Sequence, residues 1–325
     1  MTPRRGPASA DDLQELLWSF AAHRVLTAAG RTGVLEALAA EPLHADELAG
    51  RLGLEPAATA KVVRALEALG LVTREAGGCR VAPGLREVFA PGEGSLVPFL
   101  DHSHDLYLRW GENLEGWIRG EPWTTKVRDA DGVRRFAAAM RAMAGCWIPA
   151  AVRLLEPGSA RRLLDVGGGS GALARACCEA SPDLEAVVFD TGETCEVGIA
   201  ETAATPLAKR VSFVAGDYIA DDLGSGFDLV LLANVLHQET AERAETLVRR
   251  CARALAPGGR LAVIDFSIDP GGSPVGALFA INMRSFGDTH DEATIRGWLQ
   301  GAGLEAPARL DPGPQRWIIM ARRPR

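Results

Sequence analysis

The sequence predicts an α/β protein: a mostly parallel β-sheet whose last strand is antiparallel, preceded by an all-helical domain with a winged helix. Two observations predict this fold. Residues 159–325 alternate short apolar strands with helical segments, which is typical of a parallel sheet covered by helices on both faces. Residues 44–83 read as helix, turn, helix and then a hairpin around Gly77 and Gly78, the order of elements in a winged helix.

The composition is that of a globular protein with room for two domains and one large core. The chain has 325 residues, of which 47% are hydrophobic and 24% are charged. No apolar run approaches the roughly 20 residues that a membrane span needs, and the first residues lack an apolar signal segment. We therefore expect a cytoplasmic location and no membrane partner. The net charge of −7 argues against a nucleic-acid partner.

The cysteines and paired histidines do not predict a metal site. The six cysteines include no C-x-x-C pair, so reduced thiols are expected. His102 and His104 form an H-x-H pair, but no acidic residue or cysteine lies at a spacing that would complete a site. We expect these two histidines on a helix, near Tyr107 and Trp110.

The N-terminal segment reads as helix and then winged helix. Over residues 11–40, Leu13, Leu16 and Leu17 recur at helical spacing. The second helix of the winged-helix motif carries Lys61 and Arg64 but is otherwise mainly alanine, valine and leucine. A helix that reads DNA needs basic or amide side chains, so this one resembles a packing surface.

A second long helical pattern runs through the middle of the chain. Phe136, Met140, Met143, Trp147 and Ala151 lie along one face of it. These residues either fill a core or line a pocket, since methionine adapts to a flat apolar ligand. We keep Met140, Met143 and Trp147 as candidate pocket residues.

The C-terminal half contains six candidate strands. In order they are RRLLDV, EAVVFD, VSFVAG, FDLVLLAN, GRLAVIDF and RWIIMARR, and we expect helical segments between the first five. The first strand runs into a glycine-rich turn, LLDVGGGSGALARA, at residues 163–176. As Gly167, Gly169 and Ala172 the turn fits a dinucleotide site. As Gly167, Gly169 and Gly171 it resembles the turn of methyltransferases that use S-adenosylmethionine.

Carboxylates at the strand ends discriminate between these two ligands. Asp165 ends the first strand, Asp190 ends the second, and Asp217 and Tyr218 follow the third. A dinucleotide would place a doubly negative pyrophosphate on the glycine turn, where Asp165 would repel it. S-adenosylmethionine carries a sulfonium and an ammonium, which nearby carboxylates attract. No lysine followed by serine or threonine comes after the glycines, so the turn is not a P-loop.

Five motifs together resemble one enzyme family. LLDVGGGSG, VVFDTG, VAGDY, LANVLH and LAPGGRLAVID stand in the order and spacing of small-molecule O-methyltransferases of the plant caffeate type and the bacterial polyketide-tailoring type. The resemblance covers nearly the whole chain. It implies a Rossmann-like catalytic domain, S-adenosylmethionine as cofactor, a small-molecule acceptor, and a winged helix that forms a homodimer and binds no DNA.

The resemblance also divides the chain and assigns cofactor contacts. It implies a dimerisation domain at 1–105, a helical connector that lines the acceptor pocket at 106–157, and a catalytic domain at 158–325. The residues expected at the cofactor are Asp165, Gly167, Gly169, Gly171, Asp190, Thr191, Asp217, Tyr218 and Ala233.

The catalytic residues match the family only in part. His237 stands where the family has its general base, and Asp265 stands at the first of two acidic positions that orient it. The second, a glutamate, is absent; this region reads Asp288-Thr289-His290, and we keep His290 as a catalytic candidate. Asn282 and Met283 are expected to face the acceptor.

Several alternatives remain at this stage. His237 could simply pack at the strand end while proximity carries the reaction. His237 and His290 could instead hold an iron that assists C-methylation of a 2-oxo acid, although Gln238 is a poorer ligand than a carboxylate; N-methylation is a further possibility. Outside methyl transfer, the chain could be a ligand-responsive DNA-binding regulator or, against the charge of Asp165, a dehydrogenase.

Overall fold

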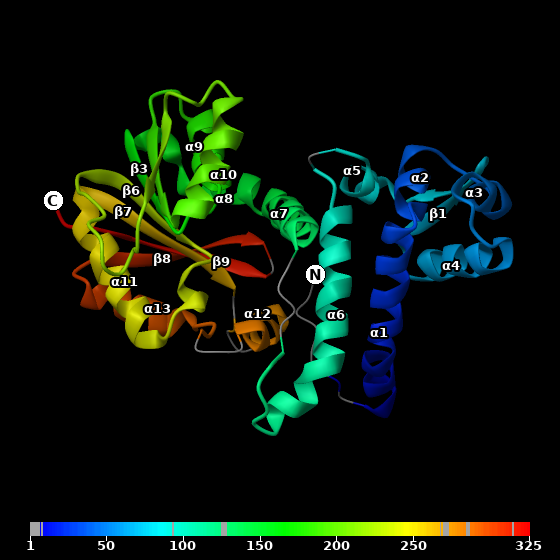
Figure 1. Cartoon of the computed structure of the whole chain (residues 1–325). Helices are drawn as coiled ribbons and strands as arrows, with labels where there is room; N and C mark the ends of the chain where they lie inside the picture. Colours follow the sequence, from blue (N-terminus) through cyan, green and yellow to red (C-terminus); the bar gives the residue numbers. More distant parts are fainter. Residues whose placement is uncertain are drawn as a thin grey trace. The chain divides into compact units, whose positions relative to one another are not determined.

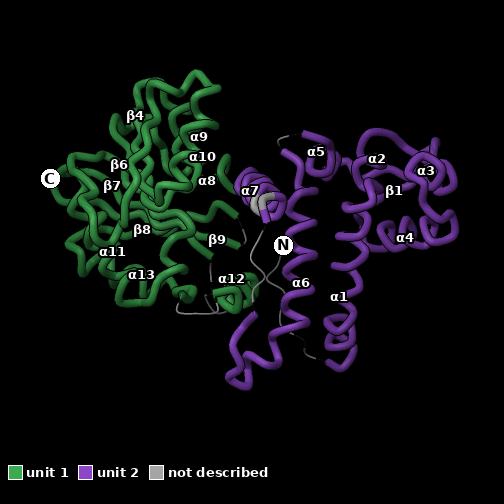
Figure 2. Tube along the Cα trace, viewed as in Figure 1, with its two compact units in different colours: residues 1–4, 147–325 green, residues 5–146 purple. Residues whose placement is uncertain are grey.

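The computed structural model describes residues 7, 9–92, 94–124, 129–266, 268, 273–283, 287–313 and 315–325. The chain divides into two compact units, of which one ends at Cys146 and the other begins at Trp147 (Figure 2). The expected three-part division at 105 and 157 concerns the roles of the segments and stays a prediction.

The N-terminal unit is mostly helical and contains the predicted winged helix (Figure 1). Leu43 extends the hairpin of the wing, because its backbone exchanges hydrogen bonds of 3.0 and 2.9 Å with Cys79. The elements of this unit are α1 (Ala10–Arg31), α2 (Val34–Ala40), α3 (Ala45–Leu52), α4 (Pro56–Ala68), β1 (Val72–Glu75), β2 (Gly78–Val81), η1 (Pro83–Leu85), α5 (Arg86–Phe89), α6 (Val97–Ile118) and α7 (Ala130–Gly145).

The helix expected over residues 11–40 is in fact two helices. Thr32 is the C-cap of α1, and Gly33 is the N-cap of α2, with a φ of +79°. This left-handed conformation favours glycine and interrupts the helix. The periodicity alone did not show the break, although the Gly33 position is a recognisable stop signal.

The first half of α1 exposes a large apolar surface. Ser9 caps this helix by accepting a hydrogen bond from the Asp12 backbone N–H at 3.1 Å. The exposed apolar side chains are Leu13, Leu16, Leu17, Trp18 and Phe20, each between 49% and 66% accessible. In the described ranges, no helix combines the length and apolarity that crossing a membrane requires.

The C-terminal unit is built on one seven-stranded sheet with the order β5-β4-β3-β6-β7-β9-β8. Neighbours from β5 to β7 are parallel, and β9 is antiparallel to both β7 and β8, which confirms the expected antiparallel last strand. The strands are β3 (Arg162–Val166), β4 (Glu185–Asp190), β5 (Val211–Ala215), β6 (Phe227–Ala233), β7 (Leu255–Phe266), β8 (Glu305–Gly313) and β9 (Arg316–Arg322).

Helices cover the two faces of this sheet. The connection between β5 and β6 differs from the one expected. No helix joins β5 to β6: residues 216–226, all described, form turns, so the expectation of a helix there was wrong. The helical elements are α8 (Ile148–Leu155), η2 (Pro157–Ser159), α9 (Ala172–Ala180), α10 (Gly192–Ala203), η3 (Leu236–Gln238), α11 (Ala241–Ala254), α12 (Val275–Ala280), η4 (Ile281–Met283) and α13 (Glu292–Gly301).

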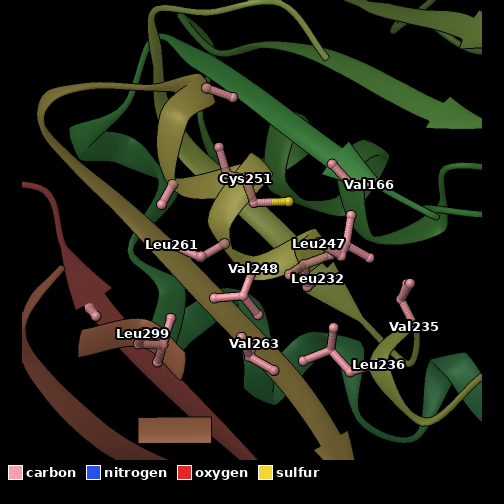
Figure 3. Packing of buried hydrophobic residues seen from close by; sticks show 14 of the residues in the cluster. Val166, Leu232, Val235, Leu236, Leu247, Val248, Cys251, Leu261, Val263 and Leu299 are labelled. Carbon is pink, nitrogen blue, oxygen red and sulfur yellow. The ribbon is translucent and has the colours of Figure 1, made fainter. Parts of the chain in front are cut away.

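One hydrophobic cluster of the C-terminal unit lies between the sheet and helices α11 and α13 (Figure 3). Side chains from β3, β6 and β7 pack against those of α11, and Leu299 of α13 closes the cluster. Central parallel strands are buried on both faces, which is why they read in the sequence as continuous apolar runs.

Two valines of this unit allow a matched test of the core. Val263 of β7 is 0% exposed within the cluster, whereas Val197 of α10 is 48% exposed. We expect Val263→Ala to lower the free energy of unfolding by roughly 2–3 kcal/mol, because it removes buried methyl groups and leaves a cavity. Val197→Ala should change it by less than about 0.5 kcal/mol. Urea denaturation measures both, and equal costs would contradict this description of the core.

Candidate active site

The register of the parallel strands brings the predicted residues to one edge of the sheet. Val166 of β3 stands opposite Phe189 of β4 and opposite Leu232 of β6. The residues that follow each of these positions are Gly167, Asp190 and Ala233. The chain reverses its strand order here, between β3 and β6, and ligands of doubly wound sheets bind at such a point.

The glycine turn has a backbone conformation that requires glycine. Gly167, Gly169 and Gly171 have φ values of +66°, +62° and +80°, in the left-handed region. The Gly167 N–H donates to the Phe189 carbonyl at 2.7 Å. The turn is thereby fixed against β4 as it leaves β3.

Asp190 ties the glycine turn to the end of β4. Its Oδ2 accepts from the Gly169 N–H at 2.8 Å, and its Oδ1 accepts from the Thr191 N–H at 2.7 Å. Hydrogen bonds from N–H groups to a charged carboxylate are among the stronger ones in proteins. Asp190 therefore shapes the turn, and it retains lone pairs for the ribose contact that the sequence predicts.

The turn also packs closely on its surroundings. A side chain on Gly167 would lie 2.6 Å from Val235 Cγ2, and one on Gly168 would lie 2.6 Å from the carboxyl carbon of Asp165. Gly168 was not among the predicted residues, although it stands between two glycines that were. Its missing side chain is what allows the Asp165 carboxyl to lie against the backbone of the turn.

Asp165 is a buried carboxyl with little hydrogen-bond support. It is 1% exposed, and neither carboxylate oxygen has a hydrogen-bond partner of good geometry among the described residues. Burial, and secondly the charge of Asp190, raise the pKa of Asp165 to about 7, while the Ala174 backbone N–H acts in the opposite direction. A cationic ligand at the turn would offset this unfavourable burial, and a polyphosphate would increase it. The residues present therefore fit S-adenosylmethionine.

The other predicted cofactor residues follow β4 and β5. Thr191 is exposed, and its hydroxyl pairs with that of Thr194 at 2.8 Å. Asp217 is also exposed, and its Oδ1 accepts from the Ile219 N–H at 2.8 Å. Both residues lie at the carboxyl ends of strands, the positions that the sequence predicts for them.

Tyr218 is held by a residue that sequence reasoning missed. Its hydroxyl donates to Glu239 Oε1 at 2.7 Å, and Glu239, itself 5% exposed, also pairs with Arg243. Burial, and secondly Glu239, raise the pKa of Tyr218. With its hydroxyl engaged, Tyr218 has its ring left for the predicted cofactor contact, and that contact stays a prediction.

His237 and Asp265 form a buried pair just beyond β6. His237 Nδ1 lies 2.6 Å from Asp265 Oδ1, and both residues are 4% exposed. The same carboxylate accepts from the backbone N–H of Phe266 at 2.8 Å and of His237 at 3.4 Å. A carboxylate accepts hydrogen bonds, so Nδ1 is the ring nitrogen that donates in this pair, and Nε2 is the nitrogen that remains for a second contact. The pairing expected from the sequence is thus present.

His290 lies in a segment that packs on the His237 loop. A side chain on Gly287 would collide with the His237 carbonyl oxygen, so the two segments are in direct contact. The His290 ring makes an edge contact with Trp298 at 4.8 Å, and its Nε2 is buried without a partner in the described residues. Burial lowers the pKa of His290, opposed by Asp265, Asp288 and a hydrogen bond with the Leu236 backbone. The burial of His290 therefore favours its neutral form.

Aromatic side chains that were not predicted surround His237. The rings of Phe266 and Phe279 stack at 4.1 Å, and Phe279 meets the imidazole edge-on at 5.0 Å. The Arg316 guanidinium stacks on Phe266 at 4.0 Å and on Trp147 at 5.3 Å. The sequence signal that could have indicated these aromatic neighbours is the phenylalanine directly after Asp265, at a strand end.

The predicted acceptor residues are half-buried and belong to different units. Met140 and Met143 lie in α7 of the N-terminal unit. Trp147, Asn282 and Met283 lie in the C-terminal unit. A common pocket for the five stays a prediction.

No metal-binding cluster of three His, Cys, Asp or Glu side chains occurs in the described part of the chain. Gln238, considered as a ligand beside His237, instead donates from Nε2 to the Asn234 carbonyl at 2.8 Å. His102 and His104 lie on α6 as expected. His102 packs edge-on against Phe136 at 5.3 Å, and His104 contacts Arg24.

Comparison with known proteins assigns the family. The model of the O-methyltransferase domain matches residues 113–305, more than half of the chain, and a DprA winged helix domain model matches residues 7–78. The 3-amino-4-hydroxybenzoate 4-O-methyltransferase of Streptomyces cremeus is 31% identical over 90% of this chain and 84% of its own. The 3-hydroxy-5-methyl-1-naphthoate 3-O-methyltransferase of Streptomyces sahachiroi is 28% identical over 91% and 89%.

A solved structure supports the same assignment. The apo form of the S-adenosylmethionine-dependent methyltransferase SibL superposes with a TM-score of 0.83, at 26% identity, over 98% of this chain and all of that one. The architecture shared with this structure and the carboxyl-lined glycine turn described above both indicate S-adenosylmethionine as the cofactor. The chain belongs to the O-methyltransferase family and is an S-adenosylmethionine-dependent methyltransferase.

Proposed function

We propose that this enzyme methylates a hydroxyl group on an aromatic or polyketide-derived small molecule of secondary metabolism. The observation that carries the proposal is the buried His237–Asp265 pair with the stacked Phe266 and Phe279 beside it. Stacked phenyl rings favour a flat apolar acceptor, and the pair suits an acceptor that must lose a proton. The relatives from Streptomyces cremeus and Streptomyces sahachiroi are named for methylation of aromatic hydroxyls, which supports the same acceptor class.

One group of side chains would hold the cofactor, and another would position and deprotonate the acceptor. Bound S-adenosylmethionine supplies an electrophilic methyl group. Asp165, Asp190 and Asp217 would hold it, together with the backbone of the glycine turn and of Ala233. The chain must then place the acceptor oxygen in line with that group and exclude water.

His237 acts in this proposal as the general base. A phenol has an unperturbed pKa near 10, so at neutral pH it attacks faster when a base takes its proton. The free lone pair on His237 Nε2 can accept that proton. Asp265 holds the ring at Nδ1 and stabilises the imidazolium that forms. His290 is a second candidate to take part in the proton transfer.

The test is methyl transfer from labelled cofactor to a panel of phenols, with wild-type enzyme and His237→Ala. We expect transfer to phenols and not to their methyl ethers. His237→Ala should lower kcat by roughly 10²- to 10⁴-fold, the usual contribution of a general base, and should leave cofactor affinity nearly unchanged. The activity of the variant should recover towards about pH 10, where the phenol ionises without help.

An exposed histidine provides the control for this experiment. His44 lies at the N-cap of α3, where its side chain makes no capping hydrogen bond, and His44→Ala should behave as wild type. If His237→Ala keeps turnover within a few-fold of wild type at neutral pH, proximity carries the reaction and the base role is wrong. If only amines or carbon acids are methylated, the proposed acceptor class is wrong.

The proposal includes a homodimer formed by residues 11–105. The exposed apolar side chains of α1, Leu13 to Phe20, support it, since a soluble monomer rarely exposes so large a contiguous apolar surface. We expect no nucleic-acid or membrane partner and a cytoplasmic location. On α4, Lys61 and Arg64 are exposed while Val63 and Leu66 are buried, a pattern of packing rather than of DNA reading.

Light scattering at micromolar concentration tests the dimer. Wild-type protein should have twice the 34.5 kDa mass of one chain. Leu17→Glu should shift it towards the monomer, because it buries a charge in the proposed interface. Val197→Glu, at a similarly exposed apolar residue of α10, should remain dimeric. A wild-type monomer, or a Leu17→Glu dimer as stable as wild type, would contradict the proposed interface.

A further inference from the structure

The site contains two carboxyl groups whose surroundings differ sharply. Asp190 uses both oxygens to accept backbone N–H groups, at 2.8 and 2.7 Å. Asp165 is 1% exposed and has no hydrogen-bond partner of good geometry among the described residues. A buried carboxylate with so little hydrogen-bond support is unfavourable, so it either takes up a proton or requires a nearby positive charge.

The position of Asp165 indicates that the positive charge would lie at the glycine turn. Its carboxyl lies against Gly168, where any side chain would come within 2.6 Å of the carboxyl carbon. A ligand seated on the turn therefore approaches the carboxyl across glycine backbone alone. The opposite charge of a cationic ligand favours the ionised form, and the effect is strong because the carboxyl is shielded from water.

Few other titratable groups act on Asp165. From β4, the charge of Asp190 disfavours ionisation, and from α9 the Ala174 backbone N–H favours it. Cys177, also on α9, interacts with Asp165, but burial raises the pKa of this thiol and keeps it neutral. Among the described residues, Asp190 is thus the charge that most affects the protonation of Asp165.

We propose that Asp165 selects the cationic cofactor by exchanging a proton for it: the carboxyl is substantially protonated in the free chain and releases its proton to solvent when S-adenosylmethionine binds. Asp190 shapes the turn, and Asp165 responds to the charge of the ligand. Binding is then linked to pH, with affinity rising as the free carboxyl ionises. A ligand with a pyrophosphate gains nothing from this group.

Calorimetry of S-adenosylmethionine binding in buffers of different ionisation enthalpy counts the protons. With a pKa of about 7, Asp165 should release about half a proton per cofactor at pH 7. Affinity should fall about tenfold from pH 8 to pH 6. Because the cofactor's own amino group titrates equally with every variant, the relevant quantity is the difference between wild type and Asp165→Asn.

Three variants test whether Asp165 is the source of the released proton. Asp165→Asn should bind more weakly and lose the half-proton release. Asp190→Asn should move the midpoint of release to lower pH, because the neighbouring charge is gone. Asp228→Asn, at the opposite end of the β3–β6 pair, where its carboxylate accepts from the Arg161 and Arg162 N–H groups, should release protons as wild type does. Identical proton counts for wild type and Asp165→Asn overturn the proposal.

The free protein supplies a second readout that needs no ligand. Folding raises the pKa of Asp165 from 3.8 to about 7, so its contribution to stability is fully present below pH 3.8 and is lost as the pH rises through about 7. Asp165→Asn should therefore gain in Tm relative to wild type between pH 6 and pH 8. A Tm difference that does not change over this range also overturns the proposal. If Asp165→Asn fails to fold, the difference in proton release between wild type and Asp190→Asn decides, and an unchanged midpoint overturns the proposal.

Discussion

The register of β3 with β4 on one side and β6 on the other is the constraint on which the site depends. It aligns Val166 with Phe189 and Leu232, so that the glycine turn, Asp190 and Ala233 leave the sheet at one edge. Asp190 then fixes the turn through the Gly169 N–H, and the loop after β6 brings His237 to Asp265 at the end of β7. A shift of β3 by one residue would move Asp165 to the other face of the sheet and dismantle this arrangement.

The electrostatics of this edge favours a cationic ligand. An opposite charge about 6 Å from an ionised carboxyl stabilises it by roughly 3 kcal/mol at an effective dielectric constant of 20, about a hundredfold in affinity, whereas an anion there keeps the carboxyl protonated and gains nothing from it. Asp165 already carries the penalty of burial in the free chain. A sulfonium and an ammonium on the turn offset this penalty, and a phosphate does not. The carboxyl before the glycine turn therefore agrees with S-adenosylmethionine, rather than a dinucleotide, as the cofactor of this chain.

Much of the fold was predictable because central parallel strands are buried on both faces. The apolar runs that become β3, β4, β6 and β7 stand out in the sequence, and the glycines mark the turn. The strand β8 was missed because Glu305–Gly313 contains two prolines and lies at the sheet edge, where burial imposes little pattern. In the site, His237 and Asp265 were foreseen from their motifs. The contacts of Tyr218 with Glu239 and of Phe279 with His237 were not, because they join segments 21 and 42 residues apart and follow from packing.

The most direct measurement is a crystal structure of the protein soaked with S-adenosylmethionine and NADH together. We expect S-adenosylmethionine on the glycine turn, with its ribose hydroxyls at Asp190 and its positively charged end towards Asp165. NADH on the turn, with its pyrophosphate against Gly167–Gly169 and S-adenosylmethionine unbound, would contradict it.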